Sequence, residues 1–152
     1  MKRIAVIYAS VHHGNTKKLL EGMAAEIPMD LFSVEEAKDK DLSSYGVVGI
    51  ASGLYFGKMH KSLLAYLDSK PSLPEKAFAV ISCGDGGAKH IEDAKETLRQ
   101  YNLAPLGAFV CKGFDTYGPF KLIGGINKNH PDAADVKKGI EFLKSEMNEA
   151  VK

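Results

Sequence analysis

Residues 10–16 read SVHHGNT and gather side chains that can bind a ligand or transfer a proton. They combine two hydroxyls, two imidazoles, an amide and a glycine, immediately before an amphipathic run. The backbone N–H groups at the start of a helix bind anions, and the positive end of the helix dipole adds to this. The pattern therefore predicts a phosphate-binding loop in which Ser10, Asn15 and Thr16 add side-chain hydrogen bonds. The alternative is a well-capped helix without a ligand, which needs only one such residue.

The adjacent histidines, His12 and His13, raise the question of a metal or acid–base site. Neighbouring side chains rarely reach the same metal ion, and neither cysteine nor carboxylate accompanies them. We therefore predict no metal site and no catalytic residue here. The histidine backbones are expected to donate hydrogen bonds to the phosphate, with one imidazole nearby.

The elements that must position this loop follow from apolar patterning. Short, continuous apolar runs predict strands that are buried on both faces, as in a parallel sheet. These runs are Arg3–Tyr8, Met29–Val34, Tyr45–Ser52, Ala77–Ser82 and Pro105–Cys111.

The segments between these runs show helical periodicity, with apolar residues at i, i+3/4 and i+7. The predicted helices are Thr16–Ile27, Lys58–Ser69, Ala88–Tyr101 and Ala133–Val151, and the segment EEAKDKDLSS predicts a short or irregular helix. Asn15 and Asp132 are candidate N-caps. Five βα units predict a single domain over residues 1–152: an α/β fold with a doubly wound five-stranded parallel sheet, order 2-1-3-4-5, and helices on both faces.

Ligands of such sheets bind at the carboxyl ends of the strands. Here the loops are SVHHGNT, SGLYFGK, CGDGGAK and a segment of 20 residues from Lys112 to Pro131. The G-x-G-x-x-G fingerprint, the Walker A loop and the G-x-S-x-G elbow are all absent. A phospho-receiver domain would need an acidic cluster after the first strand, where the chain has Ala9 and Ser10.

Composition excludes several classes of function. The 152 residues carry 20 basic and 19 acidic side chains, a formal charge of +1, without the basic stripe of a nucleic-acid-binding protein. No apolar run approaches the roughly 18 residues that span a bilayer. The N-terminal apolar run is also too short for a signal peptide. The sequence therefore predicts a cytoplasmic protein, and this location favours free thiols for Cys83 and Cys111 over a disulfide. The two cysteines also form no zinc motif.

The run IYASVHHGNTKKLLEGMA resembles the phosphate-binding signature of flavodoxins: an apolar strand, an aromatic, a hydroxyl residue, a short loop and G-x-T. Three residues separate Ser10 from Gly14, one more than is usual in that family. DLSSYGVVGIASGLYFGKMHKSLLAYL is similar to the third strand, flavin loop and following helix of the family. GFDTYGPFKLIGGINKNHP is similar to a segment of a short, anaerobe-associated branch, so the resemblance covers essentially the whole chain.

The resemblance implies an FMN cofactor, with its phosphate in the first loop and its isoalloxazine ring between the loops after strands three and four. Leu54, Tyr55 and Phe56 would supply faces for the ring, while Gly53 and Gly57 would allow close backbone approach. Asp85 either lies beside the flavin or caps the next helix, and Cys83 is interpreted as a small buried residue. The predicted cofactor-binding residues are Ser10, Val11, His12, His13, Gly14, Asn15, Thr16, Ser52, Gly53, Leu54, Tyr55, Phe56, Gly57, Ser82, Cys83, Gly84, Asp85 and Gly86.

The family resemblance implies transfer of low-potential electrons between protein redox partners, a reductase and an acceptor. Two features complicate this function: the chain lacks the acidity that steers flavodoxins to basic partners, and the 112–131 segment carries enough apolar side chains for a lid, a partner patch or a substrate wall. The pattern GLYFGKMHKSL also resembles the flavin loop of quinone-linked protoporphyrinogen oxidases. A small FMN-dependent oxidoreductase of that type is the alternative, and a flavin-binding scaffold without turnover is a third.

Overall fold

The computed structural model describes residues 3–9, 15–55, 57–83, 87, 89–112 and 132–150, with only the backbone described for Asn15, Tyr55 and residues 148–150. A central sheet contains five parallel strands in the order β2-β1-β3-β5-β6, and a short strand, β4, pairs antiparallel with the end of β3. The strands are β1 (Ile4–Ala9), β2 (Asp30–Ser33), β3 (Val47–Tyr55), β4 (Lys58–Met59), β5 (Lys76–Cys83) and β6 (Ala104–Lys112). All five predicted strands are confirmed, with ends shifted by one to three residues, and so is their predicted order.

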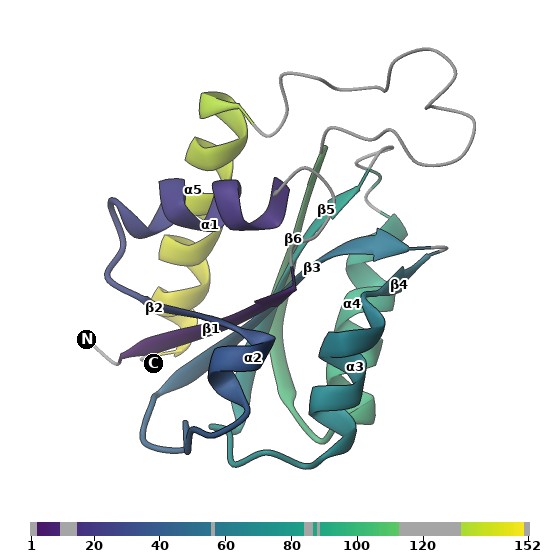
Figure 1. Ribbon diagram of the computed structural model, residues 1–152. Helices are drawn as coiled ribbons and strands as arrows, with labels where there is room; N and C mark the ends of the chain where they lie inside the picture. Colours follow the sequence, from purple (N-terminus) through teal and green to yellow (C-terminus); the bar gives the residue numbers. More distant parts are fainter. Residues whose placement is uncertain are drawn as a thin grey trace.

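Helices cover both faces of the sheet (Figure 1). Helices α1 (Asn15–Ala24) and α5 (Ala133–Ala150) pack on one face. The other face carries α2 (Val34–Ala37), α3 (Lys61–Asp68) and α4 (Lys89–Gln100). The doubly wound α/β architecture predicted from the alternating patterns is therefore confirmed.

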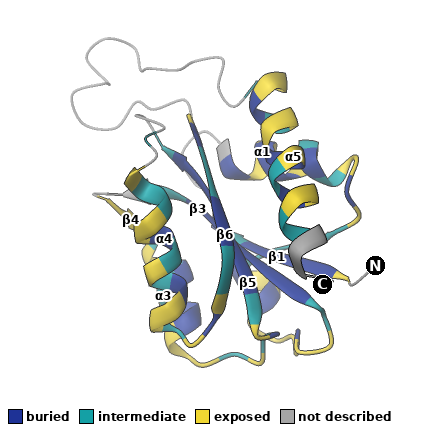
Figure 2. Cartoon of the chain, turned by 180° about the vertical axis from the view of Figure 1, so that it is seen from behind, coloured by how far each residue is buried: buried dark blue, intermediate teal, exposed yellow. Residues whose placement is uncertain are grey.

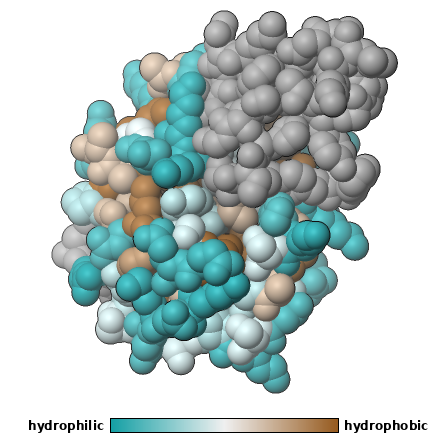
Figure 3. Space-filling model, in the orientation of Figure 1, coloured by the Kyte–Doolittle hydropathy of each residue, from teal (hydrophilic) through white to brown (hydrophobic). Residues whose placement is uncertain are grey.

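Two apolar layers, one on each face of the sheet, form the core. Within β1, Ala5 and Ile7 face the α2–α3–α4 layer, while Ile4 and Val6 face the α1–α5 layer. Because both faces are covered, the strands are continuously apolar. Figure 2 shows buried strands between helices whose outer sides are exposed, and Figure 3 shows that hydrophilic side chains cover most of the described surface on the face seen there.

The region around residues 56–60 differs from the sequence prediction. Lys58 and Met59 form β4 rather than the start of a helix, and α3 begins three residues later, at Lys61. The His60 ring accepts a hydrogen bond from the N–H of Ser62, so His60 caps this helix. This hairpin depends on pairing between β3 and β4, which helical periodicity does not register.

The short helix predicted in the second crossover is confirmed, but it begins at Val34, which was assigned to the preceding strand. Ser33 and Glu36 form a capping box: the N–H of Ser33 donates to Glu36 Oε1 (3.0 Å) and the N–H of Glu36 donates to Ser33 Oγ (3.2 Å). These bonds satisfy backbone groups at the helix start and end the strand at Ser33.

The predicted N-cap of the last helix is confirmed. The N–H of Asp135 donates to Asp132 Oδ1 (3.0 Å), and the N–H of Asp132 donates to Asp135 Oδ2 (2.8 Å). At the other end of the chain, Asn15 is the first residue of α1 rather than the residue before it. No helix within the described ranges is long and apolar enough to cross a membrane.

Two glycines allow α1 and α5 to pack closely. A Cβ atom on Gly22 would lie 2.9 Å from Val136 Cγ2, and one on Gly139 would lie 2.8 Å from Met23 Sδ. Both distances are shorter than real Cβ contacts, so the helix separation depends on these glycines. The packing fixes where α1 begins, beside the carboxyl ends of the strands.

Candidate cofactor-binding site

The carboxyl ends of β1, β3 and β5 lie side by side. Ala9, at the end of β1, pairs with Ser52 of β3, and Gly53 pairs with Ser82 of β5. The strand order reverses direction between β1 and β3, which is where sheets of this kind bind ligands. The three loops predicted to bind the cofactor thus begin from adjacent positions.

A buried pair of hydroxyls joins two of these positions. Thr16 Oγ1 lies 3.1 Å from Ser82 Oγ, and the two residues are 2% and 4% exposed. One hydroxyl donates to the other, which leaves one proton and several lone pairs for a further partner. Thr16 was predicted in the phosphate loop and Ser82 among the cofactor-binding residues at the end of the fourth predicted strand, and the structure brings them into contact.

The Ser52 hydroxyl forms its hydrogen bonds within the hairpin at the end of β3. Its hydroxyl donates to the carbonyl of Gly53 (2.6 Å) and accepts from the N–H of His60 (2.9 Å), and the residue is fully buried. These bonds tie β3 to the start of α3. The buried side chain of Ser52 therefore stabilises the conformation of the hairpin.

The hairpin itself carries the predicted ring-contacting residues. Leu54 pairs with Met59, and Tyr55 pairs with Lys58. Gly57 has φ +80°, in the left-handed region, and a Cβ there would meet no atom within 4 Å. The glycine is thus required by backbone conformation, not by crowding.

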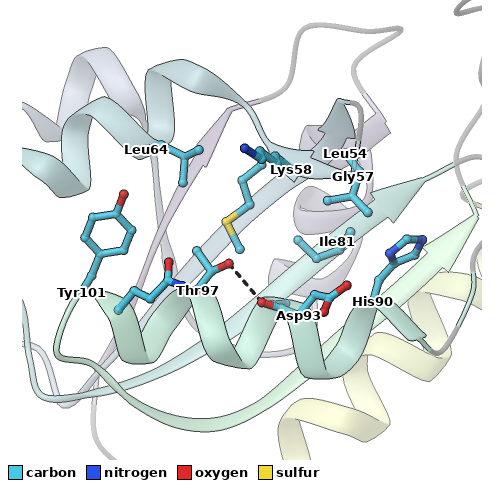
Figure 4. A pocket seen from close by; sticks show the side chains of 12 residues that line it. Leu54, Gly57, Lys58, Leu64, Ile81, His90, Asp93, Thr97 and Tyr101 are labelled. Carbon is cyan, nitrogen blue, oxygen red and sulfur yellow. Dashed lines mark hydrogen bonds between the residues drawn. The ribbon is translucent and has the colours of Figure 1, made fainter.

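A pocket of about 360 Å³ opens between this hairpin and α4 (Figure 4). Leu54 and Gly57 from the hairpin and Ile81 from β5 lie on one side, while His90 and Asp93 from α4 lie on the other. The hydroxyl of Thr97 donates to the backbone carbonyl of Asp93 (3.0 Å). The α4 residues were missed by the sequence reasoning; their only signal was their place beside the apolar stripe of that helix.

The structure shows both cysteines as free thiols, as predicted. Cys83 is half-buried at the end of β5, and Cys111 is buried at the end of β6. Burial raises the pKa of the Cys111 thiol to about 12, and the nearby carboxylate of Asp135 adds to this shift. No cluster of three metal-ligating side chains occurs in the part of the chain that the structure describes.

The remaining predicted site residues lie wholly or partly outside the described residues. For Asn15 and Tyr55 only the backbone is described, in α1 and β3. Ser10, Val11, His12, His13, Gly14, Phe56, Gly84, Asp85 and Gly86 lie outside, as do residues 113–131 of the long segment. Their assignments stay predictions.

Comparisons with known proteins extend these findings. A family model described as "Flavodoxin domain" matches residues 5–114. An uncharacterized protein of Methanocaldococcus jannaschii is 39% identical over 142 residues, which cover 92% of this chain and 95% of the relative.

Solved structures show the same fold at low sequence identity. Oxidised flavodoxin 1 from Bacillus cereus superimposes with a TM-score of 0.66 at 15% identity, covering 96% of this chain and 97% of the other. A flavoprotein from Lactobacillus acidophilus, solved in complex with FMN, gives a TM-score of 0.55 at 16% identity, covering 70% of this chain and 91% of the other.

Proposed function

Because this chain belongs to the flavodoxin-domain family, we propose that it binds FMN at the carboxyl ends of β1, β3 and β5 and carries low-potential electrons between protein partners. The observation that carries the proposal is that the carboxyl ends of β1, β3 and β5 lie side by side at the reversal of strand order. A flavoprotein with the same fold, solved in complex with FMN, supports the choice of cofactor.

The described residues fit the two chemical ends of FMN. At the phosphate end, the N-terminus of α1 presents backbone N–H groups, and the Thr16–Ser82 pair has one hydroxyl proton to donate further. At the ring end, Leu54 and Ile81 line an apolar side of the pocket next to the hairpin. A flat apolar ring with polar edges needs this combination of surfaces.

When bound, FMN supplies the one- and two-electron redox chemistry. The residues of this chain would orient the flavin and determine the polarity of its surroundings. The hairpin, tied to α3 through Ser52, would hold its backbone against one edge of the ring, and Gly57 can change conformation there at little steric cost. The first loop, including His12, His13 and Gly14, would donate backbone hydrogen bonds to the phosphate. The partners are a reductase and an acceptor, and the free thiols support a cytoplasmic location.

The alternative, a small FMN-dependent oxidoreductase that uses a quinone-like molecule, is favoured by the pocket in Figure 4. Its volume lies within the range of small-molecule sites, and it combines apolar side chains with His90 and Asp93. The pocket touches the proposed flavin hairpin at Leu54, so a bound donor would lie beside the ring.

Binding can be measured by the quenching of FMN fluorescence on addition of the apoprotein, with riboflavin as the matched ligand that lacks the phosphate. We expect FMN to bind at least about tenfold more tightly than riboflavin, since each 1.4 kcal/mol of phosphate interaction is a factor of ten. Failure to bind either ligand would overturn the proposal.

A redox titration of the reconstituted protein followed by visible spectroscopy then separates carrier from enzyme. A carrier takes up electrons in two separated one-electron steps and exchanges them with a ferredoxin-type protein. The oxidoreductase instead reduces a soluble quinone, or oxidises a small donor, with multiple turnovers. A scaffold does neither.

A further inference from the structure

The hairpin that borders the proposed ring site is short. Two residue pairs, Leu54–Met59 and Tyr55–Lys58, join its arms, and β4 leads into α3 (Figure 1). A two-stranded hairpin is at best marginally stable on its own in water. Contacts beyond the two pairs must therefore hold its conformation, and one of them is the buried side chain of Met59, which is 5% exposed.

A second contact closes the base of the hairpin. The N–H of His60, the residue after β4, donates to Ser52 Oγ (2.9 Å). Ser52 is fully buried within β3 and lies between Ala9 of β1 and Ile81 of β5 in the sheet. The bond thus connects the rigid part of the sheet to the residue at which the hairpin ends.

The imidazole of His60 fixes the other side of this residue to α3. The N–H of Ser62 donates to His60 Nδ1 (3.1 Å), so this nitrogen carries no proton, and the Ser62 hydroxyl at 2.7 Å must donate to it as well. The carbonyl of His60 accepts from the N–H groups of Leu63 and Leu64 (3.0 and 3.2 Å). Hydrogen bonds on its N–H, its carbonyl and its ring therefore hold His60 between the hairpin and the helix.

Helix α2 has a comparable cap on the same face of the sheet. The N–H of Glu36 donates to Ser33 Oγ at 3.2 Å, close to the length of the bond from Ser62 to His60. Both helices pack against the same apolar layer. They differ in what precedes them, since α2 follows β2 directly whereas α3 follows the hairpin. Loss of the α2 cap should affect the fold alone, and loss of the α3 cap should also loosen the hairpin.

We propose that His60 is a positioning residue for the flavin ring: it joins Ser52 to the first turn of α3 and so holds the hairpin in the conformation that receives the ring. The inference rests on the proposed FMN function. His60 acts through the backbone of the hairpin and needs no contact of its own with the cofactor. Apparent affinity falls in proportion to the fraction of molecules whose site is formed, so a loosened hairpin binds the ring less tightly.

The test compares the dissociation constants of FMN and riboflavin, which share the ring but not the phosphate, by fluorescence quenching. We expect His60→Ala to weaken both ligands by the same factor, about fivefold, which corresponds to a typical N-cap loss. His60→Asn introduces a preferred N-cap and should return both affinities to within about twofold of the parent. A loss confined to FMN would place the effect at the phosphate and overturn the proposal.

Ser33→Ala is the matched control, because it removes the equivalent hydrogen bond from α2. In urea denaturation it should destabilise the apoprotein to a similar extent as His60→Ala, yet leave the affinity for both flavins within about twofold of the parent. At saturating FMN, the visible circular dichroism of the bound flavin should change in His60→Ala only. If Ser33→Ala weakens the flavins as much as His60→Ala does, the effect is a general loss of stability and His60 has no positioning role.

The apoprotein gives a readout that needs no flavin. Hydrogen exchange of a peptide spanning residues 52–60 should be faster in His60→Ala than in the parent, and unchanged in Ser33→Ala. Unchanged exchange in His60→Ala contradicts the proposed anchoring. A parent protein that binds neither flavin is a failure of the FMN function, whereas a parent that binds both, with no loss in His60→Ala, is a failure of this inference alone.

Discussion

Thr16 and Ser82 stand 66 positions apart in the chain, and their hydroxyl oxygens lie 3.1 Å apart in a buried contact. The contact joins the first turn of α1 to the penultimate residue of β5, and so links two elements that border the proposed cofactor site. Because the pair has hydrogen-bonding capacity left over, it can stabilise the fold and also contact a ligand.

Ser82→Ala removes one partner and leaves the Thr16 hydroxyl unpaired in a buried position. We expect a loss of about 1–3 kcal/mol in the free energy of unfolding of the apoprotein, measured by urea denaturation. The double variant Thr16→Val/Ser82→Ala replaces both polar groups, so its loss should be smaller than the sum of the two single losses. An additive result would contradict direct coupling of the two hydroxyls.

Gly57→Ala tests the conformation of the hairpin. At φ +80° an alanine is strained by its backbone alone, since no neighbouring atom crowds the position. We expect a loss of about 1–2 kcal/mol in unfolding free energy, with a smaller loss for Gly57→Asn, because asparagine tolerates this region better. Equal stability of the alanine variant and the parent would show that the turn relaxes to another conformation.

Cys111 predicts a pH dependence of stability. Its folded pKa, raised to about 12 chiefly by burial, lies above the unfolded value of roughly 8.5. The unfolded chain therefore loses the thiol proton first as pH rises, so this contribution to stability is complete below about pH 8.5 and declines above it. Unfolding free energies measured from pH 7 to 10 should fall less steeply for Cys111→Ala than for the parent.

The same protonation state protects the thiol from alkylation. At pH 8, Cys111 should react with iodoacetamide far more slowly in the folded protein than in urea, because the thiolate is the nucleophile. Cys83, which is half-buried, serves as the internal comparison by mass spectrometry.

The sequence predicted the sheet order and both helical layers because continuous apolar strands and periodic helices leave a strong pattern. The hairpin at Lys58–Met59 was missed because β4 has only two residues, too few to show an alternating pattern, and Met59 also fits the apolar spacing of the helix that follows. The start of α2 had a readable signal, the Ser33–Glu36 capping box, which the strand-like run before it outweighed. The candidate site was predicted from loop position and stays a prediction, whereas the contact between Thr16 and Ser82 requires the register of strands and helix, which no local pattern encodes.

The glycines between α1 and α5 give the last prediction. Alanine at either position gains intrinsic helix propensity, about 1 kcal/mol, but must find room for a methyl group. At Gly22 the nearest group is Val136 Cγ2, at 2.9 Å, on a β-branched side chain with little rotamer freedom. At Gly139 it is Met23 Sδ, at 2.8 Å, on a flexible side chain that can turn aside.

We therefore expect Gly22→Ala to lower the unfolding free energy by about 1–3 kcal/mol, and Gly139→Ala to lower it by less. Moving α1 also moves the helix start at the proposed phosphate site. Gly22→Ala should therefore weaken the binding of FMN more than the binding of riboflavin, which lacks the phosphate. If Gly139→Ala is the more damaging variant in urea denaturation, the two helices are held apart by Met23 rather than by the valine contact.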